Sequence, residues 1–108
     1  MTTLDVLKAA RELISDPARW TQGFFARDGA GMPAYASDPR ATRWCLEGAL
    51  IKFCLGDASY AAALMVLRRE QPVPQLPAYV YNDDHTHAEV LALFDAAIAR
   101  LESEARYA

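Results

Sequence analysis

The sequence has no long apolar run, no excess of basic residues and few cysteines, and each shortage excludes a class of protein. No run approaches the roughly 20 apolar residues that a helix needs to span a bilayer, so we expect no membrane segment. Asp5, Arg11 and Glu12 interrupt the N-terminus where a secretory signal needs an unbroken apolar stretch. The 11 Lys and Arg residues are outnumbered by 14 Asp and Glu residues, which argues against nucleic acid as a partner.

The two cysteines, Cys45 and Cys54, are predicted to be free thiols. They lie nine residues apart on one predicted helix, which places them on opposite faces, so they cannot form a disulfide with each other. Free thiols are typical of a reducing compartment. We therefore expect a cytoplasmic protein.

The length predicts a single helical domain over residues 1–108. A chain of 108 residues, 53% of them hydrophobic, is long enough for one core and too short for two ordinary domains. The expected fold is mainly α: a compact bundle of about four helices around a central helix at about 38–55. A signal for a small β-hairpin lies near 23–36.

Signals at both ends define the expected central helix. Asp38 can cap its first N–H groups, Pro39 suits the first helical position, and Gly56 can close it in the left-handed conformation. A narrow stripe that includes Glu47 is polar and solvated, and most of the remaining surface between these ends is apolar, so the helix should be buried on several sides. Gly48 in its middle indicates that another backbone or a bulky ring lies close by.

Capping signals mark three further helices, and prolines mark a connector. The helix starts are Thr2 with Asp5 before a helix that ends at Asp16, Asp57 before a helix at about 58–70, and Thr86 with Glu89 before the last helix. Three prolines in residues 71–77 exclude helix and central strand, so this segment should be an extended connector. For residues 78–81 the sequence predicts a short extended segment, and for residues 82–85 a loop.

The hairpin signal consists of aromatic residues on either side of an Asp-Gly-Ala-Gly turn. Pro33 would restrict its second arm to the edge of a sheet. The large apolar side chains of this segment are expected to cover the core, and they become a candidate protein-binding surface if they are exposed. They are Phe24, Phe25, Met32 and Tyr35.

Cys45 is the first candidate for catalysis. A nucleophilic cysteine with His85 or His87 downstream has the order found in some cysteine hydrolases. A reactive thiolate needs an electropositive, partly open setting such as a helix N-terminus. In the predicted helix, however, Cys45 lies about two turns from the start, between Trp44 and Leu46, which favours a small buried hydrophobe.

The segment from Asn82 to His87 is the densest cluster of groups that can bind a metal or move a proton. The candidate metal ligands are Asp83, Asp84, His85 and His87. The same residues also serve to start a helix, because Asp and Asn before a capping Thr favour its positive end. Helix initiation accounts for most of the cluster, and we expect no metal or other cofactor at this loop.

Three segments together resemble a family of small uncharacterised bacterial and phage proteins. Its members share a Trp-Cys-x-x-Gly-Ala helix and a later Trp-Asn-Asp segment before a Thr-x-x-Glu-Val helix. In this chain the corresponding segments begin at Trp44, Tyr81 and Thr86, with Tyr81 in place of Trp. The resemblance covers roughly residues 20–100 and implies no activity. It draws attention to Trp44, Cys45, Gly48, Asn82 and Asp83.

Three functions fit these observations. The leading hypothesis is a small cytoplasmic, non-catalytic binding protein that acts on an unknown protein partner or on itself, with Trp44, Asn82 and Asp83 as candidate binding residues. The second is a small enzyme with Cys45 as nucleophile and a base from residues 83–87. The third is a sensor that binds a small ligand or a metal at that loop.

Overall fold

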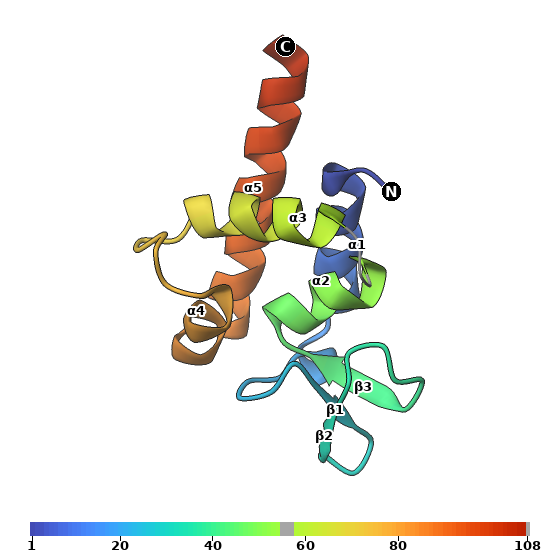
Figure 1. The fold of residues 1–108 in the computed structure, drawn as a ribbon. Coiled ribbons are helices and arrows are strands. Elements are labelled where there is room, and N and C mark those ends of the chain that lie inside the picture. Colours follow the sequence, from blue (N-terminus) through green and yellow to red (C-terminus); the bar gives the residue numbers. More distant parts are fainter. Residues whose placement is uncertain (55–57, 108) are drawn as a thin grey trace.

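In the computed structural model, which describes residues 1–54 and 58–107, helices surround a core and a small sheet lies at one end (Figure 1). The helices are α1 (Thr3–Leu13), α2 (Leu46–Cys54), α3 (Ala58–Arg69), α4 (Ala78–Asp84) and α5 (His87–Tyr107), with a 3-10 turn, η1, at Pro17–Arg19. The strands are β1 (Ala26–Asp28), β2 (Pro33–Ala34) and β3 (Ala41–Trp44). The expected mainly helical fold is confirmed.

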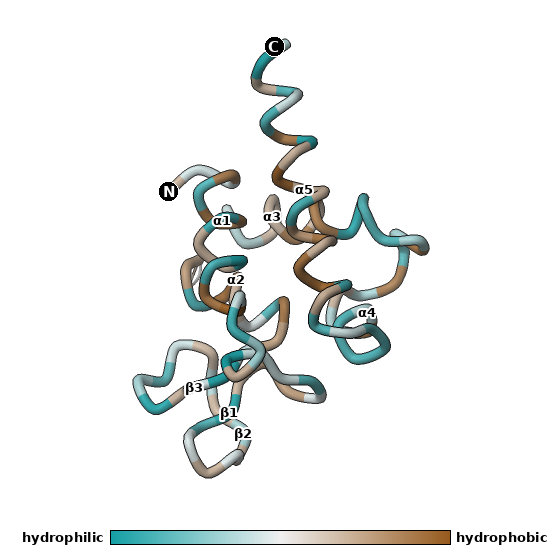
Figure 2. The backbone as a smooth tube through the Cα atoms, turned by 180° about the vertical axis from the view of Figure 1, so that it is seen from behind, coloured by the Kyte–Doolittle hydropathy of each residue, from teal (hydrophilic) through white to brown (hydrophobic). Residues whose placement is uncertain are grey.

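The core lies where α1, α2, α3 and α5 meet. Each of these helices contacts at least two of the others, and the largest buried side chains include Phe94, Leu7, Ile14, Leu46 and Leu50. Figure 2 shows apolar segments gathered where α1, α2 and α5 pass through the middle of the molecule. The C-terminal end of α5 projects beyond this body (Figure 1).

Several local predictions are confirmed. Thr2 and Asp5 form the expected capping box of α1. Backbone N–H groups of Thr86 and Glu89 bond each other's side chains at the start of α5, at 2.9 and 3.2 Å. The hairpin is β1 with β2, and Pro33 lies in the edge strand of the order β2-β1-β3. Residues 70–77 contain no helix or strand.

The predicted extent of the central helix is wrong, because its first part is strand β3. Asp38 to Ala41 form a turn, in which the Ala41 N–H donates to the Asp38 carbonyl oxygen at 2.9 Å. Asp-Pro is as typical of the first two positions of such a turn as of a helix start. The chain then pairs antiparallel with β1, with Trp44 opposite Ala26. Helix α2 begins only at Leu46.

The prediction of an extended segment and loop over residues 78–85 is also wrong, because residues Ala78–Asp84 form helix α4. The helix begins after Pro77, which supplies no side-chain cap. Its first turn is capped from α2 instead: the Tyr79 N–H donates to Glu47 Oε2 at 2.7 Å. The roles expected of Gly56 and Asp57 fall on residues outside those that the structure describes.

Candidate functional site

Cys45 lies immediately before α2, between the end of β3 and the first turn of the helix. The Cys45 N–H donates to the carbonyl oxygen of Phe25 at 3.1 Å, and Cys45 Sγ accepts a hydrogen bond from the Gly48 N–H at 3.3 Å. Cys45 therefore caps α2, as Ser or Thr does in other helices. The prediction that it lies two turns inside a helix is wrong.

The position at a helix start does not make this thiol reactive. Only 2% of Cys45 is exposed. Burial raises the pKa of the thiol to about 12, and the negative charges of Glu47 and Asp83 add to this rise. The nucleophilic form is the thiolate, so Cys45 is protonated and weakly nucleophilic at neutral pH.

The two imidazoles are engaged elsewhere. His85 Nδ1 lies 2.8 Å from the carbonyl oxygen of Tyr81, and the two rings stack at 3.7 Å. His87 Nε2 lies 2.6 Å from the carbonyl oxygen of Ile14. Because a carbonyl can only accept, each of these nitrogens donates. Within residues 1–54 and 58–107, neither histidine hydrogen-bonds to Cys45.

The candidate metal ligands of residues 83–87 do not gather around one point. Over the described part of the chain, no group of three or more His, Cys, Asp and Glu side chains is placed to hold an ion. Asp83 and Asp84 lie in the last turn of α4, and His87 is the first residue of α5. The candidate ligands are therefore spread over two helices.

Asn82 is a buried connecting residue, with no exposed surface. Its Oδ1 accepts hydrogen bonds from Trp20 Nε1 at 2.8 Å and from the Leu46 N–H at 3.0 Å. Its Nδ2 donates to the carbonyl oxygen of Thr21 at 3.0 Å. These bonds join α4 to α2 and to the segment after η1. Trp44 is likewise buried, and its Nε1 donates to the carbonyl oxygen of Ala36 at 3.0 Å.

A hollow of about 270 Å³ lies in front of Cys45. Its lining combines three aromatic side chains with one carboxylate and one thiol: Gly23, Phe24, Phe25, Cys45, Tyr79 and Asp83. Asp83 Oδ1 accepts a hydrogen bond from the Gly23 N–H at 2.9 Å, which closes one wall. We call this space the Cys45 hollow.

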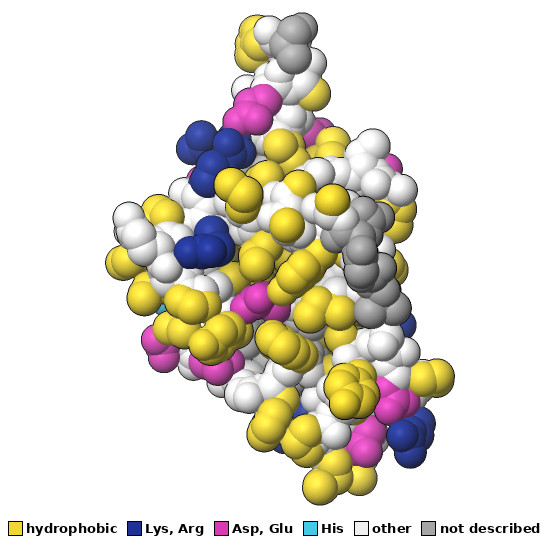
Figure 3. Space-filling view, viewed as in Figure 1, with side chains coloured by type: hydrophobic (Ala, Val, Ile, Leu, Met, Phe, Trp, Pro, Cys, Tyr) yellow, Lys and Arg dark blue, Asp and Glu magenta, His cyan; other side chains and the backbone are white. Residues whose placement is uncertain are grey.

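A second hollow of about 650 Å³ adjoins the first, because Phe24 and Phe25 line both. It continues along the edge strand β2 toward Tyr35 and Arg40. We call the two hollows together the aromatic groove. Figure 3 shows hydrophobic side chains gathered over this face of the molecule, with acidic side chains among them.

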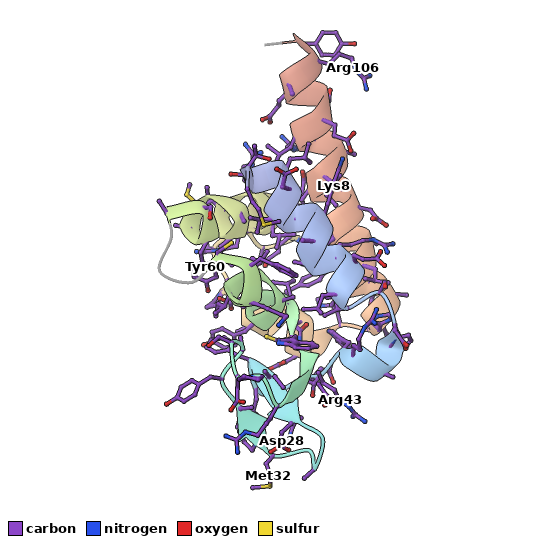
Figure 4. The ribbon with its side chains drawn as sticks, turned by 90° about the vertical axis from the view of Figure 1, so that its right-hand side faces the viewer. Lys8, Asp28, Met32, Arg43, Tyr60 and Arg106 are labelled. Carbon is purple, nitrogen blue, oxygen red and sulfur yellow. The ribbon has the colours of Figure 1, made fainter. Side chains whose placement is uncertain are left out.

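The expectation that the large apolar side chains of the hairpin cover the core is wrong. They are exposed, so they become the candidate protein-binding surface. Phe24 is 48% exposed, Phe25 46% and Tyr35 84%. Met32, also exposed, points outward at the tip of the hairpin (Figure 4). In the same view, Arg43 and Tyr60 lie on opposite sides of the molecule.

Sequence reasoning misses two residues near this site, Tyr79 and Glu47. The sequence predicts Tyr79 in an extended segment and Glu47 on a solvated stripe of the central helix. Glu47 is in fact only 6% exposed, and its Oε1 accepts a hydrogen bond from the Tyr60 hydroxyl at 2.9 Å. A charged residue that follows Trp-Cys-Leu in an apolar segment is the one signal that could have marked it as buried.

We expect Cys45 to resist a thiol reagent until the protein opens. In a Cys54→Ser variant, which leaves one thiol, the reaction of 5,5′-dithiobis(2-nitrobenzoate) at pH 7.5 should be at least about a hundredfold slower than in guanidinium chloride. The reason is that Cys45 is buried and protonated. Labelling of the folded variant within seconds would contradict this and favour a nucleophilic Cys45.

The match to a protein family is the one comparison that finds a relative. A family model described as a family of unknown function, DUF6197, matches residues 1–100. No curated protein and no solved structure matches the chain. Among the described residues, no helix is both long and apolar enough to cross a membrane. The match covers α1 to most of α5, including the whole aromatic groove, and the chain therefore belongs to the DUF6197 family.

Proposed function

We propose that this protein is a non-catalytic binding module, and that its aromatic groove receives an extended segment of a partner protein. The observation that carries the proposal is the pair of adjoining hollows that share Phe24 and Phe25. Both rings are about half exposed, at 48% and 46%. Aromatic residues gathered on an open, hollowed face are typical of protein-binding sites.

The chemistry of the groove favours binding over catalysis. Its one thiol, Cys45, is buried, and burial raises its pKa to about 12. The histidines that could have served as a base donate to backbone carbonyl oxygens of Tyr81 and Ile14. A nucleophile needs a base within hydrogen-bond reach, and among the described residues neither histidine hydrogen-bonds to Cys45.

The shape of the groove favours a peptide segment over a compact ligand. The two hollows meet at Phe24 and Phe25, and Tyr79 lines only the first hollow while Arg40 lines only the second. The second hollow runs beside β2, an edge strand of the sheet. Extended segments bind in this way, with alternate side chains entering successive pockets.

The two free thiols support a reducing compartment, such as the cytoplasm. Cys45 and Cys54 are both buried and both free. Secreted domains of this size usually pair their cysteines in disulfides. This placement is part of the proposal.

Peptide selection tests the groove. A phage-displayed library of random peptides is panned on the immobilised wild-type protein, and the selected peptides are measured against Phe24→Ser. We expect at least about a tenfold loss of affinity, because truncating an aromatic anchor at the centre of an interface has an effect of this order. Tyr107→Ser is the matched control, because Tyr107 is 81% exposed at the far end of α5. It should leave the affinity unchanged.

Two results would contradict the proposal. One is a set of selected peptides that bind Phe24→Ser as well as they bind the wild type. The other is a wild-type dimer in size-exclusion chromatography that dissociates in Phe24→Ser, because the groove would then be occupied by a second copy of the chain.

A further inference from the structure

We infer that the Cys45 hollow binds a basic side chain, arginine or lysine, of the partner segment. This inference rests on the proposed function, since it assumes that a peptide segment lies in the aromatic groove. It adds that this segment carries a positively charged residue at one end. The size of the hollow, its aromatic rings and its charges all support a basic side chain.

The size and lining suit a cation on an apolar stem. A volume of about 270 Å³ is enough for one long side chain and too small for a folded element. Phe25 and Tyr79, 46% and 47% exposed, line the hollow with aromatic rings. The faces of such rings attract ammonium and guanidinium groups, and arginine more often than lysine.

Arg27 is a basic residue that packs against this lining, and it is not among the residues that line the hollow. Its guanidinium carbon lies 4.6 Å from the centre of the Phe24 ring. Its Nε donates to Thr21 Oγ1 and its Nη1 to the Gly31 carbonyl oxygen, both at 2.9 Å, which holds it on the hairpin side. The guanidinium of Arg27 therefore already packs on the Phe24 ring. The rings of Phe25 and Tyr79 are left to contact a second cation.

Asp83 supplies a carboxylate to the lining of the hollow. Its Oδ1 accepts hydrogen bonds from the Gly23 N–H at 2.9 Å and from Asn82 Nδ2 at 3.3 Å. Among residues 1–54 and 58–107, its Oδ2 accepts none, and no Lys, Arg or His forms a salt bridge with it. An ammonium or guanidinium group in the hollow could bond this oxygen.

A second negative charge, that of Glu47, lies behind the hollow. Glu47 is buried, and its two oxygens accept from the Tyr60 hydroxyl and the Tyr79 N–H at 2.9 and 2.7 Å. Across the described residues, no basic side chain pairs with it. Burial raises the pKa of Cys45, and the charges of Glu47 and Asp83 add to this rise while the backbone N–H groups of Gly48 and Glu47 oppose it, so both carboxylates lie close enough to act on this wall of the hollow.

The start of α2 does not offer free N–H groups to an anion in the hollow. A helix N-terminus binds anions through its free N–H groups. At α2, however, the Leu46 N–H donates to Asn82 Oδ1 and the Gly48 N–H to Cys45 Sγ, at 3.0 and 3.3 Å. These donors are already used inside the protein, so they do not make the hollow an anion site.

The test compares two short peptides of equal shape, acetyl-Leu-Arg-Leu-amide and its counterpart with neutral citrulline in place of arginine. Each is titrated to 10 mM into the ¹⁵N-labelled protein, and the amide shifts of Gly23 and Tyr79 are followed. We expect the arginine peptide to bind at least about fivefold more tightly, as one partly exposed ion pair with a ring contact implies.

Two isosteric variants locate the effect. Asp83→Asn keeps the Oδ1 acceptor for the Gly23 N–H but removes the charge, and it should reduce the preference for arginine to less than about twofold. Asp84→Asn removes the same charge one residue away, at a side chain that lines a different hollow with His85, and it should keep the preference. Thermal midpoints confirm that both variants are folded.

The outcomes separate this inference from the proposed function. If both peptides shift the groove amides with equal affinity, the groove binds peptides and the cationic preference is wrong. The cationic preference is also wrong if the tighter binding of arginine survives in Asp83→Asn. If neither peptide shifts any groove amide, both the inference and the proposed function are wrong.

Discussion

Replacing Asn82 by Ala should lower the free energy of unfolding by about 3 to 5 kcal/mol, since it leaves two buried polar groups and one partly buried group without partners at about 1 to 3 kcal/mol each. For a chain of this length, this corresponds to a fall of the thermal midpoint by roughly 15 °C or more. Urea titration followed by circular dichroism measures the change. The orphaned groups are Trp20 Nε1, the Leu46 N–H and the carbonyl oxygen of Thr21.

The effect should be large because water cannot replace the lost partners. Asn82 and Leu46 have no exposed surface, and the Leu46 N–H belongs to the first turn of α2. An unpaired donor in such a place retains its full cost of desolvation.

The matched control is Asp84→Ala, two residues further along the same helix. Asp84 is exposed, and its replacement should change the stability by less than about 0.5 kcal/mol. Equal effects of Asn82→Ala and Asp84→Ala would show that the Asn82 bonds do not contribute to stability. In that case these bonds would not be what holds α4 against α2.

Replacing Gly48 by Ala should lower the free energy of unfolding by about 2 to 4 kcal/mol, although Ala favours a helix interior over Gly by about 1 kcal/mol. A Cβ atom at Gly48 would lie only 1.9 Å from the carbonyl oxygen of Phe25. This neighbour is backbone, and the same oxygen accepts the Cys45 N–H, so it cannot turn aside as a side chain would. The thermal midpoint and the urea midpoint should both fall.

Gly29→Ala is the control for this substitution. No atom lies within 4 Å of a Cβ built at Gly29, which is in the hairpin turn. We expect a change of less than about 1 kcal/mol there. Stability of Gly48→Ala equal to that of the wild type would mean that β1 and α2 can move apart at little cost.

The elements that the sequence predicts well are those with signals inside a few residues. The capping boxes of Thr2 with Asp5 and of Thr86 with Glu89 mark the starts of α1 and α5 correctly. The turn between β1 and β2 lies in the expected Asp-Gly-Ala-Gly segment, and Gly31 rather than Gly29 takes the left-handed conformation. Gly48 correctly indicates a close backbone, and the structure shows that Phe25 provides it.

The errors arise where a distant residue decides between two local possibilities. Asp38-Pro39 fits a helix start and a turn equally well, and pairing of Trp44 with Ala26 favours the turn. Helix α4 has no cap in its own sequence, and Glu47, 32 residues earlier than Tyr79, provides one. No local pattern contains this information.

The site is predicted only in part for the same reason. The hairpin pattern marks Phe24 and Phe25 as a candidate surface, and both are half exposed. The sequence also marks Cys45, but it places this residue in the middle of a helix because it sets the start of α2 too early. Tyr79 joins the hollow only through the fold of α4, so its role cannot be derived from the sequence.

Helices α2 and α4 each begin on a side chain of the other. Asn82 of α4 caps the Leu46 N–H at the start of α2, and Glu47 of α2 caps the Tyr79 N–H at the start of α4. Fraying of either start removes the partner's cap, so the two starts open and close as one cooperative unit. Because Cys45 and Tyr79 border these starts, the same event would open the back wall of the Cys45 hollow.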